Sequence, residues 1–268
     1  MSSSYAIGDP GHLGREVQPG PPLAPGSGAD VEISEYRVPG AHIRAASTRG
    51  LLHRHWSTAR QDAFSITYHQ PTNTVFIAVA DGVSAHANSR QAATIAVETA
   101  ARTWAEGATR EGATPLAGVA GSVNTELLGA RSQGQDLGLT TLTMVTVAIT
   151  GDRAAQVEVA WVGDSPVWEL HQGAWTQITT HAQAGMEVAI DALPHPQAQF
   201  HYANTTVEAG AVFVMTDGVG DAMVGDDVAS QLASWWATPP DGFSFGQQVG
   251  FVRRTFFDDR TCVGVWVE

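Results

Sequence analysis

Three apolar segments of the chain each end close to an aspartate. The segments are residues 76–80, 159–162 and 212–215, and the aspartates are Asp81, Asp164 and Asp217. Apolar runs of this length between turn residues are typical of strands that are buried on both faces. A carboxylate buried at the end of such a strand is costly unless it has a hydrogen-bond partner or a cation. We therefore expect these aspartates to gather at one edge of a sheet and to bind a divalent metal.

The rest of the pattern predicts an α+β fold. Residues 41–47 and 62–68 alternate as strands do, and the second would form a hairpin with residues 76–80. Helical spacing predicts helices at 86–107 and 115–130, packed as an antiparallel pair. Further strands are expected at 139–149, 154–162, 167–171, 175–178, 199–207, 211–215 and 261–267, and short helices at 226–236 and 245–256. Strands on either side of a helical pair favour a sandwich of sheets and helices.

The N-terminal part of the chain has a different composition. Residues 18–28 are rich in proline and glycine and offer little apolar surface to bury. We expect residues 1–38 to be a disordered tail and residues 39–268 to form one domain.

Composition excludes several classes of function. The formal charge of −13 comes from 27 acidic and 14 basic residues, all of the latter arginines, and no basic stripe suits a nucleic-acid partner. No apolar run approaches the about 18 residues of a membrane span, and the N-terminus lacks a secretion signal. The single cysteine, Cys262, is typical of a reducing cytosol, so we expect a cytoplasmic protein. Arginine in place of lysine indicates a bacterial genome rich in GC.

Six aspartates at or just beyond predicted strand ends are candidate metal ligands: Asp62, Asp81, Asp164, Asp217, Asp221 and Asp259. No cysteine or histidine cluster has the spacing of a zinc site, so oxygen ligands for Mg²⁺ or Mn²⁺ are the better match. The glycines that follow Asp81 and Asp217 allow close approach of the backbone, so a carbonyl could also ligate. Two such ions about 3.5–4 Å apart can share a water, lower its pKa and direct it at a phosphorus atom.

Six stretches, taken in order, resemble the metal-dependent protein phosphatases, the PPM or type 2C family of serine/threonine phosphatases. They are Arg60-Gln-Asp-Ala-Phe64, Ala80-Asp-Gly-Val-Ser-Ala-His86, Leu139-Thr-Thr-Leu142, Val162-Gly-Asp-Ser165, Thr216-Asp-Gly-Val-Gly-Asp221 and Asp258-Asp-Arg-Thr261. Gly50-Leu-Leu-His53 is similar to a bacterial branch of the family. The resemblance spans residues 41–268 and implies a four-layer α-β-β-α sandwich of two antiparallel sheets flanked by helices.

The resemblance also implies roles for individual residues. Asp81 would bridge two Mn²⁺ or Mg²⁺ ions, the Gly82 carbonyl would ligate one of them, and Asp217 and Asp259 would complete the other. Asp258 directly precedes Asp259 and is the alternative for that place. Asp62 would contact the ions through water. Asp164 and Asp221 match the ligands of a weaker third ion.

The phosphate-binding and catalytic side chains are less well defined. The family's phosphate-binding arginine usually lies five residues before the aspartate that matches Asp62, where this chain has Ser57. Arg54 and Arg60 are the candidates to replace it, with surface charges as the alternative interpretation. His86 matches a histidine of bacterial motifs, although it also suits the start of the following helix, so no catalytic side chain is assigned.

The expected function is that of a Mn²⁺- or Mg²⁺-dependent serine/threonine protein phosphatase. It would hydrolyse phosphomonoesters on phosphorylated proteins by direct attack of a metal-bridging hydroxide, without a phosphoenzyme. A serine/threonine kinase of the same pathway would be its functional partner. The alternative, motivated by Ser57, is a catalytically weak or inactive relative that serves as a binding or regulatory module. Clustered aspartates argue against it, because like charges repel one another when no cation is bound.

Overall fold

The structure is a computed structural model that describes residues 5–11, 20–21, 23, 28–83, 86, 88–109, 112–151, 153–179 and 192–268. The first sheet runs in the order β1 (Val31–Val38), β2 (Ala41–Thr48), β11 (Arg260–Val267), β10 (Ala211–Met215), β7 (Val167–His171) and β8 (Ala174–Gln177). The second runs in the order β3 (Ala63–His69), β4 (Thr74–Ala80), β5 (Leu142–Gly151), β6 (Ala154–Val162) and β9 (His201–Glu208). All of these strand pairs are antiparallel.

The period-two pattern of the strands builds the central layers. On β4, Val75 and Ile77 contribute to the apolar cluster between the two sheets, whereas Phe76 and Ala78 belong to a second cluster beneath helices. Successive side chains of a strand point to opposite faces, so a strand that is apolar throughout is buried on both. This explains why the most continuous apolar segments form the central strands.

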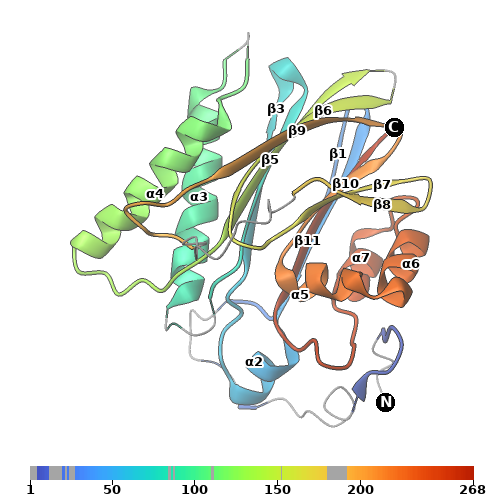
Figure 1. The fold of residues 1–268 in the computed structure, drawn as a ribbon, viewed down its shortest axis with the longest axis horizontal. Helices are drawn as coiled ribbons and strands as arrows, with labels where there is room; N and C mark the ends of the chain where they lie inside the picture. The colour runs from blue at the N-terminus through green and yellow to red at the C-terminus, as the bar shows by residue number, and fades with distance from the viewer. Residues whose placement is uncertain are drawn as a thin grey trace, which may run out of the picture.

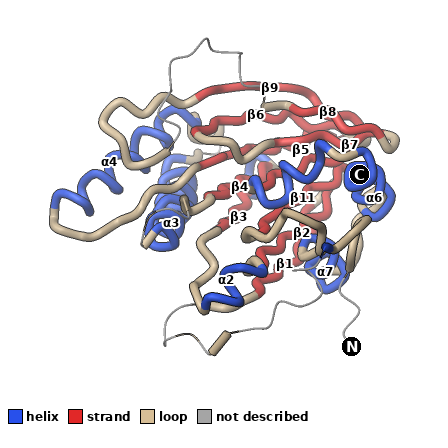
Figure 2. The backbone as a smooth tube through the Cα atoms, turned by 60° about the horizontal axis from the view of Figure 1, so that its bottom comes forward, coloured by secondary structure: helices blue, strands red, loops and turns tan. Residues whose placement is uncertain are grey.

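Helices cover the outer faces of both sheets (Figure 1). α3 (Ser89–Gly107) and α4 (Leu116–Ser132) pack on the second sheet, where Trp104 stacks on Phe76 at 5.0 Å between ring centroids. α6 (Asp226–Trp235) and α7 (Gly242–Val249) cover the first sheet through a cluster that includes Phe213, Trp236 and Phe245. The result is the expected α-β-β-α sandwich, seen from a second side in Figure 2. No described helix has the length and apolar character that a membrane span requires.

The N-terminal segment differs from the expected tail. Residues 31–38 form β1, which pairs with β2 from Val31↔Thr48 to Val38↔Ala41. Before it, Ile7 is buried, and its amide donates to the Val252 carbonyl at 3.1 Å. β1 is an edge strand whose side chains are mostly exposed, so it carries little of the apolar pattern that marks a strand in sequence. Residues 12–19, 22 and 24–27, which hold much of the proline- and glycine-rich stretch, lie outside the described residues.

Three short elements lie at one rim of the sandwich. They are α2 (Leu51–Trp56), α5 (Asp217–Gly220) and the 3₁₀ helix η2 (Asp221–Val224). α2 falls in a stretch for which the sequence analysis predicts no helix, because a helix of six residues is too short to show a period. Another 3₁₀ turn, η1 (Gln70–Thr72), closes the β3–β4 hairpin at the opposite end of these strands.

Candidate metal centre

Strand register brings the predicted aspartates to one edge of the sandwich. Asp62 directly precedes β3 and Asp81 directly follows β4, and the β3–β4 pairing places the two side by side. The β10–β11 pairing does the same for Asp217 and residues 258–259 in the other sheet. Asp164 lies just beyond the end of β6 on the same side as the end of β4. Antiparallel pairing, with chain ends alternating, is thus what gathers residues that are far apart in sequence.

A cleft of about 220 Å³ lies between these strand ends. Its described lining residues are Asp81, Gly82, Val83, Thr141, Gly163, Asp164, Asp217 and Asp258, with no basic side chain among them. Asp81 and Asp217 each shift the pKa of the other's carboxyl group, so the two groups lie close together. Carboxylates at close range repel one another unless one carries a proton or a cation lies between them.

The electrostatics of the cleft fit a divalent cation. Burial raises the pKa of Asp62 and of Asp81 well above the usual range, and neighbouring carboxylates add to the rise. Burial, followed by the charges of nearby aspartates, raises the pKa of Asp217 to about 6. Burial and the charge of Asp164 raise the pKa of Asp221. Hard oxygen donors whose own charges oppose one another are the donor set that Mg²⁺ and Mn²⁺ prefer.

Asp62 lies behind the cleft rather than on it. Its side chain is buried, and its Oδ2 accepts hydrogen bonds from Thr216 Oγ1 at 2.9 Å and Thr261 Oγ1 at 2.7 Å. Thr261 is held in turn by Ser47 Oγ, at 2.6 Å. Asp62 therefore ties the start of β3, in the second sheet, to the end of β10 and the start of β11, in the first sheet.

The neighbouring residues Asp258 and Asp259 differ in their surroundings. Asp258 is exposed and lines the cleft. Asp259 is buried, and its two carboxylate oxygens accept hydrogen bonds from the amides of Gly50 and Gln61, each at 2.6 Å. Asp259 thus anchors the start of α2, whereas Asp258 faces the cleft. One carboxylate oxygen of each nevertheless lies within 4.8 Å of the other and of a ring nitrogen of His53, a grouping that could hold a metal ion.

Two glycines let the backbone come close at the site. A Cβ on Gly218 would overlap the carbonyl oxygen of Asp259, so only glycine fits directly after Asp217. A Cβ on Gly82 would lie 2.9 Å from the Gln61 carbonyl oxygen. The Gly82 carbonyl itself is left out of the ladder bonds that flank it, which keeps it available as a ligand.

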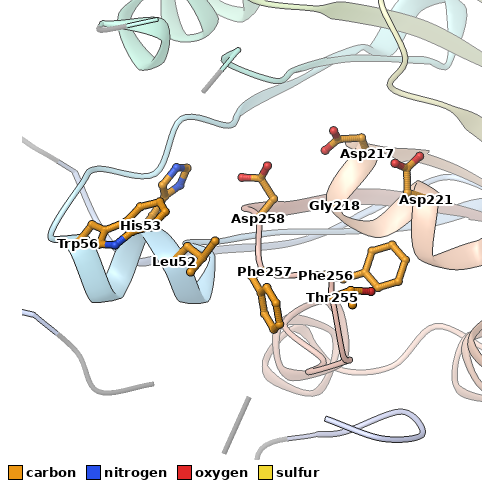
Figure 3. Close-up of a pocket in the computed structure, with 10 residues that line it drawn as sticks. All are labelled: Leu52, His53, Trp56, Asp217, Gly218, Asp221, Thr255, Phe256, Phe257 and Asp258. Atoms are coloured by element: carbon orange, nitrogen blue, oxygen red, sulfur yellow. The ribbon is translucent and has the colours of Figure 1, made fainter. Parts of the chain in front are cut away.

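A second cavity, of about 350 Å³, adjoins the cleft and shares Asp217 and Asp258 with it. Figure 3 shows its lining, with His53 and Trp56 projecting from α2 and the carboxylates on the side of α5. Nδ1 of His53 lies 2.9 Å from Oδ1 of Asp259. Burial lowers the pKa of His53, but the neighbouring carboxylates of Asp259, Asp258 and Asp62 outweigh this effect, so the pKa lies above its usual value.

Comparison with protein families matches residues 49–242 to the family described as Protein phosphatase 2C. The match covers most of the chain and contains Asp62, Asp81, Asp164, Asp217 and Asp221. The chain belongs to the protein phosphatase 2C family. It is therefore a metal-dependent serine/threonine protein phosphatase, as expected.

Solved structures share the fold of this phosphatase at low sequence identity. The catalytic domain of the serine/threonine protein phosphatase PstP, in complex with 2 manganese ions, has a TM-score of 0.60 and 20% identity over 85% of this chain and 98% of its own. The S. agalactiae serine/threonine phosphatase has a TM-score of 0.56 and 22% identity, over 89% and 100%. RsbX in complex with magnesium has a TM-score of 0.54 and 12% identity, over 88% and 100%. None of the curated proteins compared matches the chain.

The structure places the candidate phosphate-binding arginines of this phosphatase away from the cleft. Arg60 donates to the Ser47 carbonyl at 3.0 Å and pairs with Glu32 at 2.6 Å. Arg54 donates from Nε to the Arg49 carbonyl at 2.8 Å, and it lines neither cavity. Both arginines hold the backbone together around α2, so neither expectation is supported by its position.

Two residues that line the cavities have no role of their own in the sequence analysis. Asp258 appears there only as the alternative to its neighbour, and His53 only as part of a stretch that resembles the bacterial branch. His86, by contrast, is exposed and absent from the described lining of both cavities. The sequence analysis looks for a basic side chain five residues before Asp62. His53 lies further back, on α2, so a fixed spacing does not find it.

Proposed function

We propose that the phosphatase hydrolyses phosphoserine and phosphothreonine at the 220 Å³ cleft, with two divalent ions held there. The proposed ligands are the carboxylates of Asp81, Asp217 and Asp258 and the carbonyl of Gly82. The observation that carries this assignment is the gathering of Asp81, Asp217 and Asp258 in a cleft whose described lining has no basic side chain. Carboxylates gathered in this way repel one another, and a pair of cations would be bound because it relieves that repulsion.

Bound ions of this kind lower the pKa of a shared water and stabilise the charge that develops on a phosphoryl group. The protein's own residues prepare the place for this chemistry. The Asp81 carbonyl accepts from the Thr141 amide and from Thr140 Oγ1, each at 2.8 Å, which fixes the backbone and leaves the carboxylate to face the cleft. Asp62, held by its threonines, orients the strand ends without lining the cleft itself.

A weaker ion is proposed between Asp164 and Asp221. Both are exposed, and the charge of Asp164 contributes to the raised pKa of Asp221. Asp81 and Asp217 are half-buried whereas this pair is exposed, so an ion there would keep more of its waters and bind less tightly. Asp217 lies close enough to feel both charges, which links the two sites.

The wider setting is part of the same proposal. Substrates would be phosphorylated proteins supplied by a serine/threonine kinase of the same pathway in a bacterial cytoplasm. Bacterial names among the structural neighbours support the source, and the single buried cysteine suits a reducing compartment. We propose a catalytic domain that begins with β1 near residue 31, with the segment around Ile7 packed against it. The alternative of an inactive binding module gains no support from the comparisons.

Manganese-dependent turnover of a phosphoserine peptide tests the proposed function. Wild type should hydrolyse the peptide with Mn²⁺ and stop with EDTA, and Asp81→Asn should lower turnover by about a hundredfold or more. Asp226→Asn is the matched control, because Asp226 is exposed on α6 and lies outside both cavities. Full activity of the Asp81→Asn protein, or turnover that ignores EDTA, would reject the assignment of the cleft.

A further inference from the structure

The second cavity, of about 350 Å³, combines carboxylates with apolar side chains. Four apolar residues belong to its lining: Leu52 and Trp56 from α2, and Phe256 and Phe257 from the segment before β11. In Figure 3 the three carboxylates of the lining lie across the upper part of the view, and these apolar side chains lie below them. The cavity therefore offers an apolar surface directly beside the carboxylates that it shares with the cleft.

Trp56 differs from the other apolar residues of this lining in its exposure. Of the eight tryptophans, all of which lie in the described part of the chain, only Trp56 is exposed, at 63%. Leu52, Phe256 and Phe257 are half-buried. A tryptophan has a large apolar surface to remove from water and is mostly buried in folded proteins. An exposed tryptophan at the border of a cavity is typical of a surface that a ligand covers.

Contacts with the backbone hold α2, and with it Trp56, in place. The Leu52 amide donates to the Phe257 carbonyl at 3.3 Å, which fixes the start of the helix against the opposite wall of the cavity. At the other end of the helix, the Thr58 amide donates to the His53 carbonyl at 2.9 Å. The apolar surface is thus formed before a ligand arrives, and covering it costs little conformational entropy of the protein.

The position of the second cavity indicates which part of a substrate would cover it. The cavity and the cleft share Asp217 and Asp258, so a protein segment whose phosphoryl group enters the cleft passes next to the second cavity. In an extended segment, residues two positions apart point to the same side and lie about 7 Å from each other. A segment that turns its phosphorylated residue into the cleft therefore turns the side chain two positions away towards the second cavity.

We propose that the second cavity binds an apolar side chain of the phosphorylated protein, two positions from its phosphoserine or phosphothreonine. The inference rests on the proposed function, because it takes the cleft as the place of the phosphoryl group. Trp56 is then a specificity-determining residue, which acts on the choice of substrate. Preferred substrates carry leucine or another large apolar residue at that position, whereas glycine there leaves the surface of Trp56 in water.

Competition between two phosphoserine peptides in one reaction with Mn²⁺ tests this preference. The peptides are alike except that both residues two positions from the phosphoserine are leucine in one and glycine in the other, so either direction of the bound chain is covered. The ratio of their kcat/KM values measures the preference and does not depend on how much of the enzyme is folded. Wild type should favour the leucine peptide by about tenfold or more.

Variants then assign the preference to the second cavity. Trp56→Ala should reduce the ratio to about twofold or less, whereas Trp56→Phe keeps an aromatic surface and should stay within about threefold of the wild-type ratio. Phe243→Ala is the matched control, because Phe243 is 79% exposed on α7 and lines neither cavity, so the ratio should not change.

The possible failures are distinguishable. Equal manganese-dependent hydrolysis of both peptides by wild type would overturn the inference and leave the proposed function intact. A preference for leucine that is unchanged in Trp56→Ala would place the apolar side chain elsewhere and would also overturn it. Wild type that hydrolyses neither peptide in Mn²⁺ would reject the proposed function, and with it this role of the second cavity.

Discussion

Replacing Asp217 by asparagine is expected to stabilise the metal-free phosphatase at neutral pH. Burial raises the pKa of Asp217 from 3.8 to about 6, and the charges of Asp164, Asp258 and Asp221 add to the rise. The folded state therefore holds this proton more tightly than the unfolded state does. The resulting stability is complete below about pH 4 and is lost as the pH rises through about 6, so the metal-free wild type should weaken over that window.

The size of the effect follows from the shift in pKa. A rise of about two units corresponds to about 3 kcal/mol of unfolding free energy lost between about pH 4 and pH 8. Asparagine keeps the shape of the side chain and has no charge to bury. Because 1 kcal/mol moves the melting temperature of a chain of this size by about 2–4 °C, the variant should melt about 6–12 °C above wild type at about pH 8. Near pH 4 the two should coincide.

Thermal unfolding in EDTA at about pH 4, pH 6 and pH 8 measures this gap. Asp226→Asn, an exposed change of the same chemistry, serves as the control and should show no pH-dependent gap. In Mn²⁺ the order should reverse, because wild type gains the free energy of metal binding and the Asp217→Asn protein loses a ligand. A metal-free variant that melts below wild type at about pH 8, or a gap that is the same at every pH, would refute the reasoning.

Three further predictions concern neighbouring features. Asp258→Asn should abolish both turnover and the manganese-induced rise in melting temperature, whereas Asp259→Asn should lower the melting temperature even in EDTA, because it disturbs buried bonds to backbone amides. The opposite pattern would return the ligand role to Asp259. Gly218→Ala should cost about 1–3 kcal/mol in urea unfolding, while Gly121→Ala, which has open space around it, should cost nothing. A chain that begins at residue 29 should stay folded. A chain that begins at residue 39 lacks β1 and should melt at a lower temperature than the chain that begins at residue 29. Equal melting temperatures of the two would show that β1 is dispensable.

Much of this architecture is visible in the sequence because it depends on local pattern. β4 is apolar at every position but its first, and that composition alone identifies a strand with two buried faces. α3 shows helical spacing over a long stretch, so its existence is clear even though it begins three residues later than expected. Asp81 and Asp217 stand out for the same reason: a carboxylate directly beyond a buried strand needs a partner, and the partner we propose is a metal ion.

Other features follow only from how distant segments pack. Asp258 and Asp259 are chemically identical in sequence, and which one faces the cleft depends on the backbone amides of Gly50 and Gln61 meeting the second. Arg60 looks as suitable for phosphate as any arginine until its partners, Ser47 and Glu32, are seen. A side chain's type is set locally, but its direction and partners are set by contacts between residues far apart in the chain. That is why the phosphatase family and the gathering of its aspartates could be predicted from the sequence, whereas the surroundings of Asp258, Asp259 and Arg60 required the tertiary structure.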